Sequence, residues 1–250
     1  MSVNSKMTAL ADKTRILGGL SGTLGIDQMT TEVAAANTEI VSQMSTIAQI
    51  KSALNGKTGA SGTGVNKLPQ FLNKTITAIS EDDFGGATLI DSHAFARCSQ
   101  LVSVEIPDTV TKIEQYAFIS CVKLKELIVP DSVTTIGLWC FSYLSELETL
   151  KLPSNITTLP EGAVCDCLKL SYLEIPATVT SIGGYQRCGQ SVGGATIAVK
   201  AQTPPTLASN HRWEAANTKK IIVPQGTLSA YQSATNWSAL TDLMEESTEW

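Results

Sequence analysis

A repeat of 23 residues is the feature of this sequence that most restricts its fold. Apolar positions and prolines return at this step through four successive units. The clearest columns are Leu101, Leu124, Leu147 and Leu170; Val104, Leu127, Leu150 and Leu173; Ile106, Val129, Leu152 and Ile175; Phe95, Phe118, Phe141 and Val164; and Pro107, Pro130, Pro153 and Pro176. A biased composition does not keep so many columns in register, so the sequence predicts repeated structural units that stack on one another.

The spacing inside one unit predicts its local structure. In the run Leu127-Ile128-Val129 the outer two side chains point to one face of a short strand and the middle one points away. Pro130 has no N–H to donate, so it ends the strand and turns the chain. The segment around Phe118 and Cys121 suits a helical turn or two on the opposite wall. Because one such unit leaves its apolar face uncovered, neighbouring units must stack to bury it.

The unit from Val110 to Pro130 resembles the BspA-type leucine-rich repeat of bacterial surface proteins and of some phage proteins. The segment from Ile221 to Trp237 is similar to the tail that often closes such arrays. The resemblance implies a leucine-rich-repeat solenoid over residues 68–200, with a short strand plus a turn or short helix in each unit, and a C-terminal cap over residues 201–250. The unit at Tyr185–Cys188 departs from the pattern and indicates a worn terminal repeat.

Residues 1–54 carry no repeat unit but have helical periodicity. Apolar residues return every seven positions at Ile26, Val33, Ile40, Ile47 and Leu54. This pattern favours a coiled-coil stem that makes the protein a homo-oligomer, as a dimer or a trimer. An amphipathic helix packed on the solenoid is the alternative. Residues 55–67 are rich in Gly, Ser and Thr and indicate a flexible linker.

The start of the chain, Met1–Asp12, together with this helix and the glycine-rich linker, resembles the N-terminus of tail-associated structural proteins in phages and prophages of Gram-positive bacteria. That resemblance implies a component of the virion tail that assembles in the host cytoplasm and docks on other tail or baseplate proteins. It favours a trimer. The absence of an apolar signal sequence at the N-terminus agrees with it. The alternative location is a bacterial cell surface.

Composition and motifs exclude several classes of function. Charged residues are 16% of the chain and the net charge is -5, so the basic surface that nucleic acid requires is not expected. No apolar stretch approaches the roughly 20 residues that cross a bilayer, so no membrane insertion is expected. There are only two histidines, and neither the H-E-x-x-H nor the G-x-S-x-G motif is present. The sequence therefore predicts a protein that is not an enzyme and needs no cofactor.

Two further groups have metal-ligand chemistry. The six cysteines are Cys98, Cys121, Cys140, Cys165, Cys167 and Cys188. Most occupy repeat positions that require a small apolar side chain, so we expect core packing, with disulfides or a metal site as the alternatives. The carboxylates of Glu81, Asp82 and Asp83 have the chemistry for calcium, but a solvated turn is the preferred interpretation. We expect no metal site.

Two columns are candidates for ligand or receptor binding. The position just before the recurrent Ala of the repeat holds His93, Tyr116, Trp139, Gly162 and Tyr185. Stacking would align these rings along one face, where they suit sugar rings or a protein surface. The alternative is that the rings only pack on each other. The secondary candidates form the outward column of the strands, and they are Glu105, Ile128, Lys151 and Glu174.

Together, these features predict a phage tail fibre-like structural protein whose leucine-rich-repeat head recognises a glycan or protein on the host surface. The stem, the linker and the repeats, in that order, motivate this hypothesis. A bacterial leucine-rich-repeat surface adhesin or protein-interaction scaffold is the alternative. The sequence pattern does not choose between a sugar and a protein as the partner.

Overall fold

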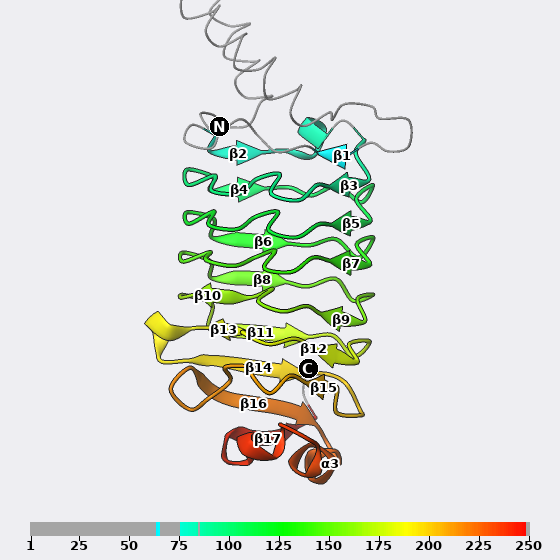
Figure 1. Ribbon diagram of the computed structural model, residues 1–250, viewed down its shortest axis with the longest axis vertical. Coiled ribbons are helices and arrows are strands. Elements are labelled where there is room, and N and C mark those ends of the chain that lie inside the picture. Colours follow the sequence, from blue (N-terminus) through cyan, green and yellow to red (C-terminus); the bar gives the residue numbers. More distant parts are fainter. Residues whose placement is uncertain (1–63, 66–75, 85, 249–250) are drawn as a thin grey trace, which may run out of the picture.

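The computed structural model describes residues 64–65, 76–84 and 86–248. The predicted stem at residues 1–54, and most of the linker, lie outside the described residues. The chain winds into stacked layers that run from β1 and β2 at one end to β17 and α3 at the other (Figure 1). The arrangement is the repeat solenoid that the period of the sequence predicts.

One wall, called here the strand face, is a series of parallel strands. Leu127 pairs with Leu150, its equivalent in the next unit, as the sequence period requires. In β6 the outer Glu126 and Ile128 are exposed while Leu127 between them is buried. The strands of this wall are β2 (Ala78–Ile79), β4 (Ser103–Val104), β6 (Glu126–Ile128), β8 (Thr149–Lys151), β11 (Tyr172–Ile175), β14 (Ala195–Val199), β16 (Thr218–Pro224) and β17 (Met244–Ser247).

A second wall consists of shorter parallel strands that follow the proline turns. The N–H of Val133 donates to the carbonyl of Pro130 at 3.0 Å, which closes the turn between the two walls. The strands of this wall are β1 (Gly64–Val65), β3 (Leu89–Ile90), β5 (Lys112–Ile113), β7 (Thr135–Ile136), β9 (Thr158–Leu159), β12 (Ser181–Ile182) and β15 (Thr206–Leu207). β1 pairs with β3, so the first described strand of this wall falls inside the range assigned to the linker.

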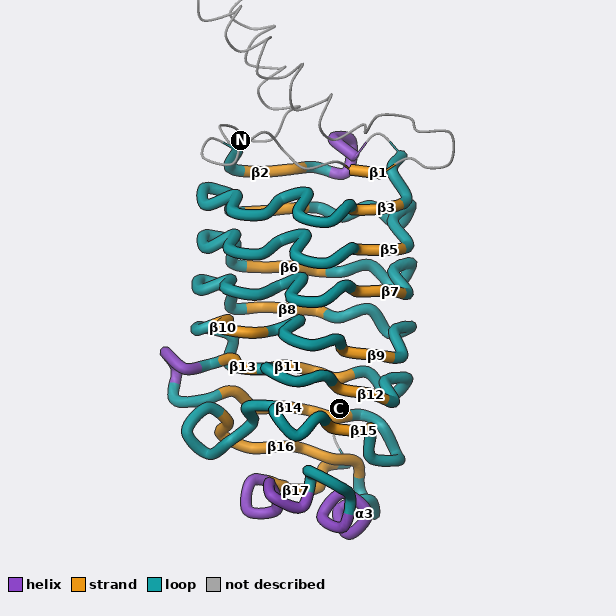
Figure 2. The backbone as a smooth tube through the Cα atoms, viewed as in Figure 1, coloured by secondary structure: helices purple, strands orange, loops and turns teal. Residues whose placement is uncertain are grey.

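The third wall, called here the turn wall, comprises residues 93–97, 116–120, 139–143 and 162–166. These segments are turns, with the short strand β10 (Cys165–Cys167) paired to β13 (Arg187–Cys188). Of the turn or short helix expected in each unit, the turn therefore forms and the helical turns do not. The reason is the backbone: the first and fifth residues of each segment have left-handed φ angles, such as 60° at Tyr116 and 61° at Ser120. A right-handed helix cannot continue through such residues. Figure 2 shows this wall as loops, apart from the short strands β10 and β13.

Alternate N–H groups on the turn wall donate to the next layer. The N–H groups of His93, Phe95 and Arg97 bond to the carbonyls of residues 115, 117 and 119 at 3.1, 2.8 and 2.7 Å. Backbone hydrogen bonds thus join the layers of this wall much as they join the strands of a parallel sheet. They give partners to N–H and carbonyl groups that would otherwise be buried unpaired.

The interior is one continuous apolar core. Leu101, Leu124, Leu147 and Leu170 are all fully buried, as the stacking predicts. The Phe95 and Phe118 rings stack with centroids 5.0 Å apart, and Phe141 follows at 6.1 Å from Phe118. Replacing one such ring with a charged side chain removes roughly 2 kcal/mol of burial and strands a charge in the core.

The C-terminal end of the solenoid is covered by helices η4 (Ser238–Leu243) and α3 (Leu228–Ser233), while η3 (Gln190–Val192) lies in the Gly-rich stretch. The Tyr231 hydroxyl donates to the carbonyl of Ala201 at 2.7 Å, and the Trp237 indole N–H donates to that of Pro205 at 2.7 Å. β16 and β17 extend the sheet of the repeats through this region, so the sheet does not stop at residue 200.

Candidate functional site

The aromatic column on the turn wall is in register. We call its members His93, Tyr116, Trp139 and Tyr185 the aromatic row. The N–H of Tyr116 donates to the carbonyl of Leu138 at 2.9 Å, and the N–H of Trp139 donates to that of Glu161 at 3.0 Å. The same bond joins each layer of the row to the next, and all four rings are partly exposed. The structure therefore brings the predicted residues onto one wall.

The rings contact each other in two pairs. His93 and Tyr116 stack with centroids 4.8 Å apart, and Trp139 and Tyr185 lie 5.6 Å apart at a tilt of 36°. The second pair spans the layer of Gly162, whose Cβ, if it had one, would lie 2.3 Å from the Trp139 ring. The indole therefore lies against the Gly162 backbone. The rings thus pack on each other in pairs. Binding of a partner by the row stays a prediction.

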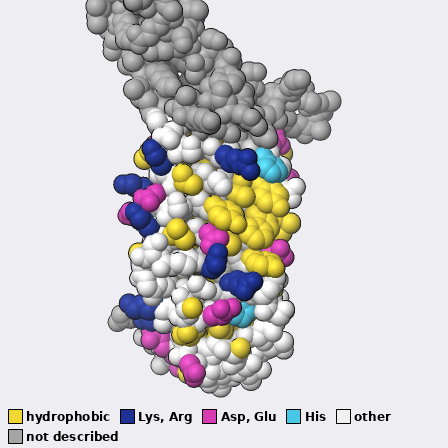
Figure 3. Space-filling model, turned by 60° about the vertical axis from the view of Figure 1, so that its left-hand side comes forward, with side chains coloured by type: hydrophobic (Ala, Val, Ile, Leu, Met, Phe, Trp, Pro, Cys, Tyr) yellow, Lys and Arg dark blue, Asp and Glu magenta, His cyan; other side chains and the backbone are white. Residues whose placement is uncertain are grey.

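Exposed apolar side chains and one arginine lie beside the aromatic row. Leu138 and Tyr143, also on or next to the turn wall, are 44% and 45% exposed. The guanidinium of Arg212 lies over Tyr185, with its central carbon 5.5 Å from the ring centroid. Figure 3 shows hydrophobic side chains gathered on one face of the solenoid, with charged side chains around them. Contiguous apolar surface of this kind is typical of interaction sites.

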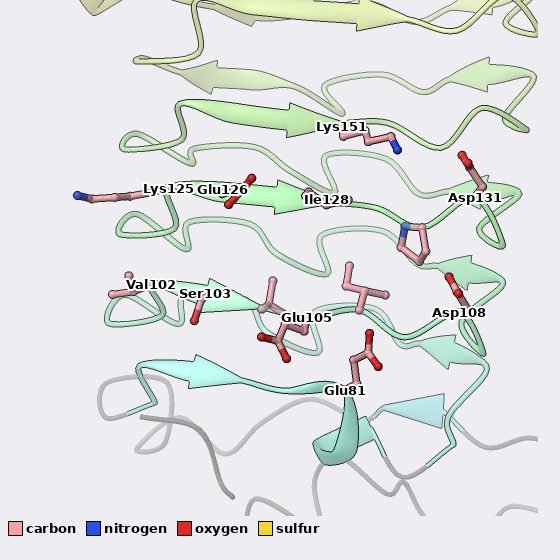
Figure 4. Close-up of a pocket in the computed structure, with 13 residues that line it drawn as sticks. Glu81, Val102, Ser103, Glu105, Asp108, Lys125, Glu126, Ile128, Asp131 and Lys151 are labelled. Atoms are coloured by element: carbon pink, nitrogen blue, oxygen red, sulfur yellow. The ribbon is translucent and has the colours of Figure 1, made fainter. Parts of the chain in front are cut away.

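The strand face carries a second candidate surface. A hollow of about 750 Å³, called here the strand-face groove, lies across β4 and β6 and reaches Lys151 of β8. Glu105, Ile128 and Lys151, three of the secondary candidates, line it (Figure 4). A neighbouring hollow of about 620 Å³ is lined by Lys151 and by Glu174, the fourth candidate. The outward column of the strands thus lies in two adjoining hollows that share Lys151.

The charged side chains of the strand face have different partners near its C-terminal end and near its middle. Near the C-terminal end Lys200 forms an ion pair with Glu174 at 2.9 Å, which neutralises both. Near the middle the Asp131 carboxylate accepts a hydrogen bond from the Ser154 N–H at 2.7 Å. That bond, the side chain of Ser154 and the charge of Lys151 lower the pKa of Asp131, so its carboxylate remains ionised at neutral pH.

The repeat period has a match among known families. The model of the BspA type leucine rich repeat region matches residues 70–189 in six copies. Residues 70–189 are a BspA-type leucine-rich repeat region. The resemblance inferred from the unit between Val110 and Pro130 is confirmed, and so is the solenoid fold.

Solved structures similar to this chain come from bacteria. A leucine rich cell surface protein from Faecalibacterium prausnitzii is 23% identical over 67% of this chain and 54% of its own, with a TM-score of 0.45. A leucine-rich repeat protein from Bacteroides ovatus is 18% identical over 74% of this chain and 64% of its own, with a TM-score of 0.38. The matches thus span less than two thirds of those chains, and they do not bear on function. No curated protein matches the sequence.

These comparisons give no support to a phage tail fibre. The segment that resembles phage tail proteins, Met1–Asp12, and the coiled-coil pattern behind the oligomer both lie outside the described residues. Within the described residues no helix combines the length and the apolar character needed to cross a membrane.

The six cysteines of the leucine-rich repeat region form no disulfide bonds and are buried, as the core interpretation predicts. The thiol of Cys121 donates to the carbonyl of Phe95 and that of Cys167 to Phe141, both at 3.1 Å. Burial raises the pKa of Cys165 to about 11 and that of Cys188 to about 12. These thiols therefore stay protonated at neutral pH and lack the reactivity of a catalytic cysteine.

Within the acidic run, Asp83 caps the start of a short helix. The Asp83 carboxylate accepts bonds from the Ser80 N–H and hydroxyl, both at 2.9 Å, and so begins the short helix η2 (Glu81–Phe84). This bonding accounts for Asp83, while Glu81 extends to the strand-face groove. Among the described residues no cluster of three or more His, Cys, Asp or Glu side chains is placed to hold a metal ion.

Two residues of these surfaces were not identified from the sequence. Arg212 lies outside the repeat columns, so no period pointed to its contact with Tyr185. Tyr172, which is 45% exposed, lines the second hollow from the beginning of β11. The contact at Gly162 did carry a signal, because a glycine that replaces an aromatic residue in one layer leaves room for the ring of the layer before it.

Proposed function

We propose that the protein is a bacterial surface adhesin or interaction scaffold that binds its partner through the aromatic row of the turn wall. The observation that carries the proposal is the contiguous, partly exposed strip in which Trp139 and Tyr185 contact across Gly162 and Arg212 lies over Tyr185. Aromatic and arginine side chains dominate the energetics of protein interfaces, and aromatic rings also stack on sugars.

The rest of the molecule supports a binding role over a catalytic one. The interior is a closed apolar core, so only outward side chains are available to a partner. The six thiols are buried, and the one His ring of the aromatic row, His93, bonds to Ser92 at 2.7 Å and stacks on Tyr116. We therefore propose that the protein is not an enzyme, which incubation with cell-surface glycans and analysis of the products would test.

The BspA-type region favours the adhesin or scaffold over the tail fibre. The tail-fibre hypothesis depended on residues 1–54, and neither the described residues nor the comparisons add to it. A surface location is part of the same proposal. Oligomerisation through the N-terminal helix, as a trimer or dimer, stays a prediction.

A cell-adhesion assay tests the proposal. The labelled full chain is incubated with bacterial and epithelial cells, and bound fluorescence is compared with that of a variant carrying Trp139→Gly and Tyr185→Gly. Glycine accepts the left-handed φ of both positions, 54° and 57°, so the variant removes the rings without adding backbone strain. Tyr172→Ser is the matched control, because it removes an exposed aromatic ring from a different wall.

We expect the double variant to lose most of the binding and the control to keep it. Equal binding by all three proteins would rule out the aromatic row as the contact surface. Periodate treatment of the cells, which destroys sugar rings, and protease treatment then distinguish a glycan partner from a protein partner.

A further inference from the structure

The strand-face groove has an excess of negative charge. Its carboxylates are Glu81, Glu105, Asp108, Glu126 and Asp131, and its cations are Lys125 and Lys151. Five carboxylates against two ammonium groups leave an excess of three negative charges. The second hollow, by contrast, has Asp131 and Glu174 against Lys151 and Lys200 and is balanced. Of these two hollows, only the strand-face groove has an excess of negative charge.

These carboxylates are not neutralised by ion pairs within the described residues. The ion pairs that form there use carboxylates outside the groove, such as Glu146 with Lys169 and Glu174 with Lys200. All five groove carboxylates belong to exposed residues, so they are available to a ligand. Uncompensated charges in a hollow raise the local concentration of oppositely charged ligands.

The floor of the groove is apolar. Ile128 is 49% exposed and Val102 is 45% exposed, and Ile128 has the highest exposure among the large apolar side chains of the described residues. In Figure 4 Ile128 lies among acidic side chains. Glu81 and Glu105 lie on one side of it, and Asp108 and Asp131 lie in the turns that follow β4 and β6. An apolar ligand side chain that covers Ile128 would remove this surface from water, which favours binding.

We propose that the strand-face groove is a second binding site, which takes an extended protein segment containing lysine or arginine next to an apolar side chain. The cations meet the carboxylates around the groove, and the apolar side chain covers Ile128. Nucleic acids and acidic glycans carry the wrong charge for this surface. The site is independent of the aromatic row, so it goes beyond the proposed function and does not depend on it.

Fluorescence anisotropy with the full chain tests the site. The probe is a short labelled peptide of lysine, leucine and serine, and its counterpart has glutamate in place of each lysine. Glu105→Lys removes a groove carboxylate and adds a cation. The matched control is Glu161→Lys, which makes the same change of charge at an exposed residue beside the turn wall. Melting curves verify that each variant is folded.

We expect the lysine peptide to bind and the glutamate peptide not to bind. Glu105→Lys should weaken binding about tenfold, which corresponds to about 1.4 kcal/mol, because it replaces an attraction in the groove with a repulsion. Glu161→Lys should leave the affinity within about twofold. Raising the salt concentration should weaken the wild type more than Glu105→Lys, because fewer charges remain to be screened in that variant.

Ile128→Ser tests the floor separately from the charge. It should weaken binding at low and at high salt alike, because it removes apolar contact and leaves every charge in place. Equal effects of Glu105→Lys and Glu161→Lys, or equal binding of the two peptides, would overturn the proposal. The variant lacking the Trp139 and Tyr185 rings should bind the lysine peptide normally, so failure of the adhesion assay and failure of this site are distinguishable.

Discussion

Gly162 and Trp139 illustrate how single residues adapt the repeat. Each of the five layers from His93 to Tyr185 has a left-handed residue at this position, and in four of them the residue is aromatic and has a Cβ. A side chain at such a φ costs about 1–2 kcal/mol, so the geometry of the layer imposes strain that the stack offsets. At Gly162 the strain is absent, and the space is used by the ring of Trp139.

Gly162→Ala should destabilise the protein by about 2–4 kcal/mol, because it adds left-handed strain at φ 63° and a clash with the Trp139 ring. Chemical denaturation measures the loss. Gly226→Ala is the control, since that glycine has φ 80° and nothing lies within 4 Å of the place that a Cβ would take, and it should show strain alone. In a protein that already carries Trp139→Gly, Gly162→Ala should cost only as much free energy of unfolding as Gly226→Ala does, because the ring that it would clash with is gone. An unchanged cost of Gly162→Ala would contradict the contact between Gly162 and the Trp139 ring.

The buried cysteines predict a pH dependence of stability. A thiol whose pKa is raised in the folded protein stabilises the fold fully below the unfolded value of 9.0. That contribution is lost as pH rises toward the folded values of about 11 for Cys165 and about 12 for Cys188. The free energy of unfolding should therefore fall above pH 9.0. In addition, iodoacetamide should modify the described thiols at pH 8 only after unfolding; rapid modification of the native protein would be inconsistent with their burial.

At the scale of elements, some features follow from the sequence and others do not. The buried columns were predictable because each recurs in four successive units, and the alternation at Leu127-Ile128-Val129 gave the strand and its outward residue. The turns of the turn wall were not predictable, because the sequence Ala-Phe-x-x-Cys suits a helix locally. Only the hydrogen bonds between layers favour the turns. Strand β1 was also missed, since Gly64 and Val65 have the composition of a linker and depend on β3 for their pairing.

The ends of the array were harder to predict for a related reason. The register steps change near the C-terminal end, where Ser181 pairs with Thr206 and Ile197 pairs with Ile221. Both steps are longer than the period of the central units, so a search at that fixed period loses the last layers. Of the two candidate surfaces, the sequence identified the columns, but the hollow around Ile128 and the position of Arg212 required the fold.

The C-terminal cap, residues 201–250, should become less stable in acid. The ring of His211 accepts the Trp213 N–H through Nδ1 at 2.9 Å, and burial lowers the pKa of His211 below 6.5, although Glu214 acts in the opposite direction. A lowered pKa means that the stabilisation is present above 6.5 and is lost as pH falls through the folded value. Hydrogen exchange of the cap should therefore accelerate below pH 6.5, and His211→Gln should reduce that acceleration. Exchange independent of pH in the wild type, after correction for the intrinsic rate, would refute this role.

At the scale of the whole molecule, the layers are interchangeable units. Deleting residues 111–133 removes one whole period and joins equivalent points of two layers, so the protein should fold with a lower melting temperature and a cooperative transition. Deleting residues 111–132 shifts the register by one, which moves apolar side chains to the solvent side. Circular dichroism should then show loss of the fold in the shorter deletion only; equal behaviour of the two would contradict the repeat register.

The predicted oligomer belongs to the same scale. Light scattering of the full chain is to be compared with a version that begins at Gly56, which keeps β1 in place. A stem-dependent dimer or trimer is the expected result, and it would multiply the binding surfaces on one particle and raise avidity. Monomers in both cases would exclude the coiled-coil stem.

A crystal structure of the protein tests the central claim, that successive layers stack in register around one core, most directly. The account predicts that the buried side chains of Leu101, Leu124, Leu147 and Leu170 lie one above another, with neighbouring layers about 4.8 Å apart along the stack. Leucines displaced sideways from one another, or exposed to solvent, would contradict the stacking and with it both proposed surfaces.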